Sequence, residues 1–183
     1  FKRNRKKPAV KQNQPKNEGH MNGLEKEILP EQIGSRNRIN RTIAVISGKG
    51  GVGKSTVSAL LACGLMMRGY RVGILDADVT GPSIPKMFGI KGGNMAKNDY
   101  GMVPQKSKMG IKIMSLNLFL RDENNPVIWR GPRIAGVVGQ FYHQADWREL
   151  DFLILDMPPG TGDIAISVIQ DIPLFGAVVV TTP

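Results

Sequence analysis

Short apolar runs alternate along the chain with segments in which apolar residues recur every three or four positions. The runs are rich in β-branched residues, which favours buried strands of a parallel sheet, and they cover residues 42–47, 71–76, 111–118, 152–156 and 177–182. Three segments between them have helical spacing, at residues 55–68, 132–147 and 163–170. This alternation predicts an α/β fold in which a mainly parallel sheet is the middle of three layers.

The first part of the chain has a different composition. Residues 1–41 contain eleven Lys or Arg and four acidic residues, so they carry +7 of the formal net charge of +10. Residues 1–22 have almost nothing to bury, which predicts disorder. We therefore expect a basic, disordered tail over residues 1–41 and one domain over residues 42–183. Contact of the tail with nucleic acid or a membrane is an alternative that we do not favour, because no aromatic residue is interleaved with its charges after Phe1.

The chain has a single cysteine, Cys63, which excludes an internal disulfide and a metal site made of cysteines alone. A cysteine-poor chain is typical of a reducing compartment, and no apolar run reaches the roughly 18 residues of a membrane-spanning helix. We therefore predict a cytoplasmic protein. Cys63 falls at a core-facing position of the helix over residues 55–68, which predicts a packing role.

A glycine-rich loop lies between the first predicted strand and the first predicted helix. Its sequence fits the P-loop pattern, in which backbone N–H groups and the helix N-terminus bind phosphate. Lys54 can reach the β- and γ-phosphates of a nucleotide, and the hydroxyl of Ser55 can bind Mg²⁺. The candidate nucleotide-binding residues of the loop are Gly48, Lys49, Gly50, Gly51, Val52, Gly53, Lys54 and Ser55.

The same loop also contains the G-x-G-x-x-G pattern of dinucleotide-binding folds, at Gly48, Gly50 and Gly53. Asp76 ends the next predicted strand, where such folds bind the ribose of NAD. Lys54 argues against this alternative, because it would place a charge in the first helical turn where the dinucleotide fold packs helix on strand. The P-loop interpretation is therefore favoured over a nicotinamide-dependent oxidoreductase.

Two predicted strands end in acidic residues. Asp76 and Asp78 follow the second strand and Asp156 ends the fourth, in the Walker B arrangement of a carboxylate after a buried strand. Beside a P-loop, these carboxylates can support Mg²⁺ and orient the water that attacks the γ-phosphate. Lys49 is an additional lysine in the loop. It either faces solvent or acts on the phosphates of a facing subunit, and its spacing does not decide between these.

Together these motifs resemble the deviant Walker A ATPases, whose loop reads KGGxGK followed by Ser or Thr, as residues 49–55 do (KGGVGKS). Within that group, four further strings are similar to the Mrp-type (ApbC-type) iron–sulfur cluster carriers. They are DADVTGPSIP at 76–85, WRGP at 129–132, DMPPGTGD at 156–163 and VVVTTP at 178–183. MinD- and ParA-type relatives share the lysine loop but usually lack the GPS and PPGTGD strings.

The resemblance implies a P-loop NTPase fold and an ATPase that acts as a homodimer. Lys49 would then reach the nucleotide of the partner subunit, while Lys54 and Ser55 would hold phosphate and Mg²⁺. Thr56 would add a hydroxyl contact to a phosphate. Asp78 would position the attacking water, which makes it a candidate catalytic residue together with the two lysines.

Asp76 and Asp156 would support the metal in the same scheme. The resemblance further implies a 4Fe–4S cluster that is passed to apo iron–sulfur proteins. The family's cluster ligands are a Cys-x-x-Cys pair downstream of the Thr-Thr-Pro string, so we expect the carboxy-terminal part of the fold to be missing and assign no cluster ligand to any residue present. We predict an ATP-binding and hydrolysing cluster carrier; the alternative is a MinD/ParA-like positioning ATPase that acts on membrane or nucleoid.

Overall fold

The first strand of the domain begins earlier than its composition indicates. The computed structural model describes residues 32–79, 81, 83–91, 96–120, 131–160 and 162–182. Residues 1–31 of the predicted tail therefore lie outside the described residues. Residues 38–41, which the composition assigns to the tail, belong to β1 (Arg38–Ser47) and pair in parallel with β7 (Glu149–Asp156). Their side chains are mostly polar, but the pairing uses backbone groups and needs no apolar pattern. The start of the domain therefore lies before residue 42.

In the described part of the chain, six strands form one sheet in the order β5-β6-β2-β7-β1-β8. Neighbouring strands are parallel except for β5, which pairs antiparallel with β6 at one edge. This confirms the mainly parallel sheet. The other strands are β2 (Val72–Asp76), β5 (Gln105–Lys106), β6 (Lys112–Ser115) and β8 (Gly176–Val180), with a separate antiparallel pair of β3 (Lys97–Asn98) and β4 (Gly101–Met102).

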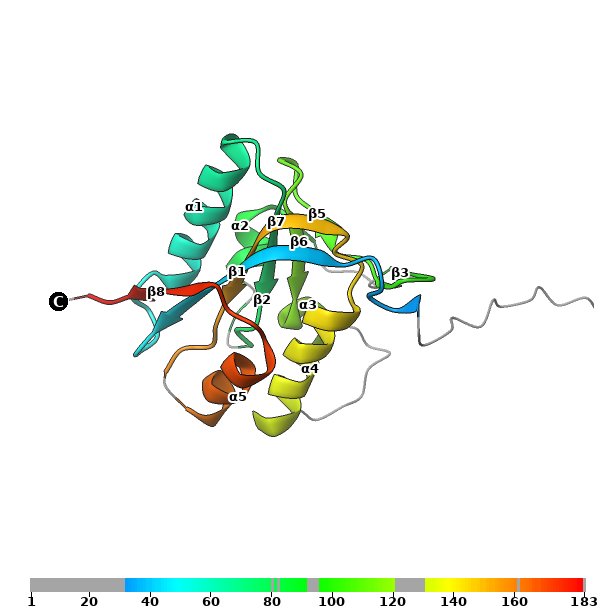
Figure 1. The fold of residues 1–183 in the computed structure, drawn as a ribbon. Coiled ribbons are helices and arrows are strands. Elements are labelled where there is room, and N and C mark those ends of the chain that lie inside the picture. Colours follow the sequence, from blue (N-terminus) through cyan, green and yellow to red (C-terminus); the bar gives the residue numbers. More distant parts are fainter. Residues whose placement is uncertain are drawn as a thin grey trace, which may run out of the picture.

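Helices cover both faces of this sheet, which gives the three predicted layers (Figure 1). They are α1 (Lys54–Met67), α2 (Ser83–Met87), α3 (Leu116–Leu120), α4 (Gly131–Gln144) and α5 (Asp163–Asp171). Successive strand residues point to opposite faces. Ile74 therefore joins a core with Ala62 of α1, and Leu75 joins a second core with Phe141 of α4 and Val168 of α5. Within the described ranges, no helix combines the length and apolar character needed to cross a membrane.

One predicted strand is partly wrong. The apolar run over residues 111–118 predicts a strand to its end, but β6 stops at Ser115 and α3 begins at Leu116. The backbone N–H of Asn117 donates to the Ser115 hydroxyl at 3.2 Å. Such a local bond offers the backbone an alternative to the ladder of the sheet. The chain therefore turns into a helix where its apolar pattern continues.

Gly101 is a position in the fold where a side chain is not tolerated. Its φ is 125°, and a Cβ atom there would lie 1.8 Å from the carbonyl oxygen of Gln144 at the end of α4. Gly101→Ala is therefore expected to lower the free energy of unfolding by about 2–3 kcal/mol, measured by urea denaturation. Gly136→Ala is the control, because Gly136 lies within α4 with open space around it and alanine favours a helix by about 1 kcal/mol. Equal effects of the two substitutions would contradict this prediction.

Candidate nucleotide site

The glycine-rich loop connects β1 to α1 at the carboxyl edge of the sheet. Gly51 and Gly53 have φ values of 82° and 89°, which glycine adopts without strain, and Gly53 is the N-cap of α1. The first N–H groups of a helix have no acceptor within it. At the start of α1 these groups lie beside the loop and can bind an anion, with the helix dipole adding to the attraction.

Asp156, at the end of β7, accepts hydrogen bonds from three side chains of α1. Lys54 Nζ donates to its Oδ1 at 2.8 Å, and the Lys54 side chain is only 6% exposed. The Ser55 hydroxyl donates to Oδ2 at 2.7 Å, and the Ser58 hydroxyl donates to Oδ1 at 2.7 Å. Lys54 Nζ also lies 3.6 Å from Asp78 Oδ2, so one buried cation faces two carboxylates.

Asp76 ends β2, directly beside Asp156 in the sheet register. Its Oδ2 accepts a hydrogen bond from the Ser115 hydroxyl at 2.8 Å, and its Oδ1 accepts one from the backbone N–H of Asp78 at 3.1 Å. Burial raises the pKa of Asp76 to about 7, and the negative charge of Asp156 adds to the rise, while the two hydrogen bonds oppose it. The sheet therefore places two buried carboxylates, those of Asp76 and Asp156, side by side at the ends of neighbouring strands.

A cavity of about 320 Å³ lies over the loop. Hydroxyl and carboxylate oxygens are the ligands that Mg²⁺ prefers, so the oxygens of Ser55 and Asp78 on its wall fit that ion, as does the carboxylate of Asp156 behind Ser55. Ser47 also lines this cavity, and its hydroxyl is buried without a hydrogen-bond partner among the described residues. The lining residues are Ser47, Gly50, Gly51, Gly53, Lys54, Ser55, Thr56, Asp78, Ser83, Met87 and Pro159.

The structure brings most of the predicted site residues together, but they differ in how deeply they are buried relative to the cavity. Asp76 and Asp156 are completely buried behind the cavity. Asp156 contacts the side chains of Lys54 and Ser55 on the cavity wall, and Asp76 contacts the backbone N–H of Asp78. Gly48 and Lys49 are exposed at the start of the loop, and neither they nor Val52 line the cavity. The predicted candidates therefore divide into the residues on the cavity wall, the two acidic residues beneath it and three loop residues outside it, Gly48, Lys49 and Val52.

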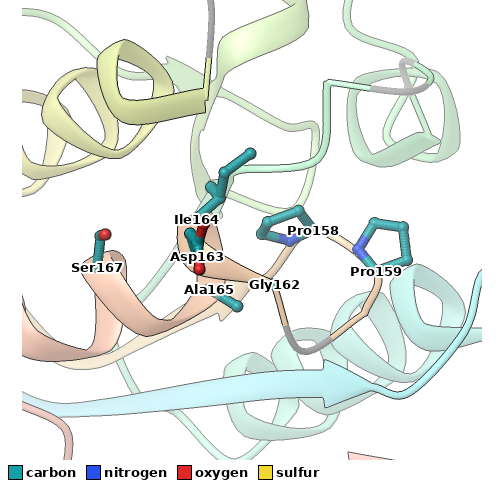
Figure 2. Close-up of a pocket in the computed structure, with 7 residues that line it drawn as sticks. All are labelled: Pro158, Pro159, Gly162, Asp163, Ile164, Ala165 and Ser167. Carbon is teal, nitrogen blue, oxygen red and sulfur yellow. The ribbon is translucent and has the colours of Figure 1, made fainter.

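A second cavity, of about 290 Å³, lies beside the loop that follows Asp156. Figure 2 shows the rings of Pro158 and Pro159 next to the first turn of α5, which supplies Asp163 and Ile164 to the cavity wall. Pro159 lines both cavities. The loop is tied to β1, because the backbone N–H of Gly160 donates to the Ser47 carbonyl at 2.9 Å. A shift of this loop would therefore change both cavities.

Several residues that shape the site are absent from the sequence prediction. Ser58 lies four residues after Lys54 on the same helical face, and this spacing could have indicated that both reach one carboxylate. Ser47, Ser115 and Asn117 belong to other strands or follow them. No local pattern marks them as partners of the acidic residues.

The fold, the glycine loop and the buried Lys54–Asp156 pair define a P-loop NTPase. Residues 38–183 match the family described as ParA: NUBPL iron-transfer P-loop NTPase. The chain belongs to this family, which confirms the resemblance to iron–sulfur cluster carrier ATPases.

Curated relatives agree with this assignment. The chain is 48% identical over 163 residues to the iron-sulfur cluster carrier protein of Clostridium perfringens and 51% identical over 147 residues to that of Methanococcus maripaludis. It is 44% identical over 151 residues to the cytosolic Fe-S cluster assembly factor Nubp2 homolog of Drosophila persimilis. These matches cover 85%, 80% and 80% of this chain but 57%, 51% and 59% of the relatives. The chain thus spans little more than half the length of these relatives.

Solved structures with the same fold include a nucleotide-binding protein from Archaeoglobus fulgidus in complex with ADP. It is 46% identical with a TM-score of 0.71, and the match covers 85% of this chain and 60% of that one. The septum site-determining protein MinD of Pyrococcus horikoshii, complexed with Mg-ADP, is 23% identical with a TM-score of 0.52, covering 79% of this chain and 58% of that one. At this identity the likeness to MinD concerns the fold alone. The P-loop NTPase fold is confirmed.

Proposed function

We propose that this chain binds ATP and Mg²⁺ and hydrolyses ATP, as the nucleotide-binding part of an iron–sulfur cluster carrier. One observation carries the proposal: Lys54, Ser55 and Asp78 line a single cavity over the glycine loop, with Asp156 directly behind them. This cavity offers backbone N–H groups and a cation for phosphate, and oxygens for a divalent ion. These are the elements that phosphoryl transfer requires.

Each group has a role in this proposal. The backbone of the loop, Lys54 and the Thr56 hydroxyl bind the phosphates. Ser55 and Asp156 hold Mg²⁺. Asp76 supports the ion indirectly, from its position beside Asp156 in the sheet. The ion supplies positive charge that offsets the negative charge on the phosphate oxygens. Asp78 reaches the cavity from the loop after β2 and orients the attacking water.

The wider role rests on the relatives, which are named as cluster carriers and as a cytosolic cluster assembly factor. We infer that the whole protein delivers clusters to apo iron–sulfur proteins in the cytoplasm and that it works as a homodimer. The exposed position of Lys49 is compatible with a contact to the nucleotide of a partner subunit. The cluster is cargo. Cys63, the only cysteine in the sequence, is partly buried against the core that contains Ile74 and Ala62. To test this wider role, a cluster is reconstituted on the whole protein, and its transfer to an apo-ferredoxin is followed by visible absorption.

Replacing Asp78 by alanine tests the proposed role of this residue in ATP hydrolysis. Asp78→Ala is expected to lower kcat for ATP hydrolysis about 30- to 100-fold, because the attacking water loses its orienting carboxylate, while the Kd for ATP changes less than about threefold. Phosphate release and equilibrium binding of a fluorescent ATP analogue measure the two quantities. Asp99→Ala is the control, because Asp99 lies in the turn between β3 and β4, and it should keep the activity of the unmodified protein. Normal turnover by Asp78→Ala would refute the role of this carboxylate.

A further inference from the structure

The segment where β6 passes into α3 contacts the acidic loop after β2. β6 is the neighbour of β2 in the sheet, and Ser115 pairs with Asp76 in the register of the two strands. Asn117, two residues later, is buried with 7% of its surface exposed. Neither residue lines the nucleotide cavity. Ser115 donates to Asp76 at the end of β2, and Asn117 donates to the loop that carries Asp78.

Asn117 contacts this loop at two points. Its side-chain amide nitrogen donates a hydrogen bond to the backbone carbonyl of Asp78 and another, of 2.9 Å, to the backbone carbonyl of Gly81. An asparagine amide has two N–H donors, so this one group can serve both carbonyls. The two hydrogen bonds connect the loop, on either side of residue 80, to the first turn of α3.

The same segment also contacts the preceding carboxylate. The Asn117 backbone N–H donates to the Ser115 hydroxyl at 3.2 Å, and that hydroxyl donates to Asp76 Oδ2 at 2.8 Å. The backbone N–H of Asp78 in turn donates to Asp76 Oδ1 at 3.1 Å. Asp78 is therefore held through its N–H on one side and through its carbonyl on the other. Fixing both backbone groups fixes the direction in which its side chain leaves the loop.

We propose that Asn117 is a positioning residue for ATP hydrolysis, which holds the backbone of Asp78 so that its carboxylate faces the nucleotide cavity and Lys54. The inference rests on the proposed function, because it concerns the water-orienting role of Asp78. Without the amide, two carbonyls lose their donor and the loop can rotate about Asp78. Small changes in orientation have large effects on a reacting group, whereas phosphate binding depends on the glycine loop.

A double-mutant cycle tests this role. The kcat for ATP hydrolysis and the Kd for ATP are measured for the unmodified protein, Asn117→Ala, Asp78→Ala and the double variant. Asn117→Ala is expected to lower kcat about tenfold with a Kd within about threefold of the unmodified value. In the Asp78→Ala background the same substitution should lower kcat less than about twofold, because the group that it positions is already absent.

A merely structural role predicts a different result. It would lower kcat by the same factor in both backgrounds, and that outcome, or an unchanged kcat in Asn117→Ala, overturns the inference. If Asn117→Ala does not fold, Asn117→Ser replaces it, since serine has one donor and cannot serve both carbonyls. Asn40→Ala is the matched control, because Asn40 is an exposed residue of β1. An unmodified protein that does not hydrolyse ATP overturns the proposed function and this role with it, whereas an active protein with an unaffected Asn117→Ala overturns the role alone.

Discussion

Replacing Lys54 by methionine is expected to weaken ATP binding about 1000-fold. Methionine has a similar length but no charge, so the phosphates lose a buried cation that also faces Asp156 and Asp78. Loss of one partner from a buried charge-assisted contact costs several kcal/mol, and each 1.4 kcal/mol corresponds to about a tenfold change in Kd. Equilibrium binding of a fluorescent ATP analogue measures the loss.

The same substitution is expected to destabilise the fold. Asp156 is completely buried, and without Lys54 its charge has no cation at hydrogen-bond distance in the described part of the chain. Breaking a buried pair in this way costs about 3–5 kcal/mol. Adding Asp156→Asn to Lys54→Met should recover most of this stability in urea denaturation. ATP binding should stay weak in the double variant, because the asparagine supplies no cation.

Lys49→Met is the matched control for the stability measurement. It removes the same charge from the same loop, but Lys49 is exposed and does not line the cavity. It should leave stability within about 0.5 kcal/mol of the unmodified protein, as most surface substitutions do. Similar losses of stability in Lys54→Met and Lys49→Met would show that the loss of a charge from the loop, and not the buried position of Lys54, determines the effect.

The predictable part of the site follows from two short-range patterns and one rule of topology. The glycine loop and Lys54 form a contiguous string, and Asp76 and Asp156 each follow a buried apolar run. The carboxyl ends of parallel strands lie at one edge of a sheet, so strands predicted as parallel bring these residues together. The register in which Asp76 pairs with Asp156 agrees with this rule.

The unpredicted part depends on strand order, which no local pattern contains. Ser115 contacts Asp76 and Asn117 contacts the loop after β2 because β6 is the neighbour of β2, although more than thirty residues separate the two segments in the chain. The apolar residues around them predict a continuous strand over residues 111–118. The spacing of Ser115 and Asn117 does not indicate that the strand ends there. The early start of β1 has a similar cause: residues 38–41 are ordered by backbone pairing with β7 and not by an apolar pattern.

Asp76→Asn is expected to make the protein more stable at pH 8 and to change its stability little near pH 4. The folded state raises the pKa of Asp76 from 3.8 to about 7, chiefly through burial. Between these two values the folded protein binds more protons than the unfolded chain, so the free energy of unfolding falls as the pH rises. The loss of stability caused by ionised Asp76 is fully present above pH 7. It amounts to at most about 4 kcal/mol, because each unit by which the pKa rises corresponds to about 1.36 kcal/mol. Urea denaturation of both proteins at a series of pH values measures it.

The difference in unfolding free energy between Asp76→Asn and the unmodified protein should therefore grow from pH 5 to pH 7 and level off above it. Asp151→Asn provides the control with the opposite shift, because the Arg71 guanidinium lowers the pKa of the Asp151 carboxyl to about 2. Both the folded and the unfolded pKa of Asp151 lie below 5, so the corresponding difference for Asp151→Asn should be flat over this range. A flat difference for Asp76→Asn as well would mean that Asp76 is already ionised at pH 5. In that case the hydrogen bonds from Ser115 and the Asp78 N–H would stabilise the Asp76 carboxylate by more than its burial and the charge of Asp156 destabilise it.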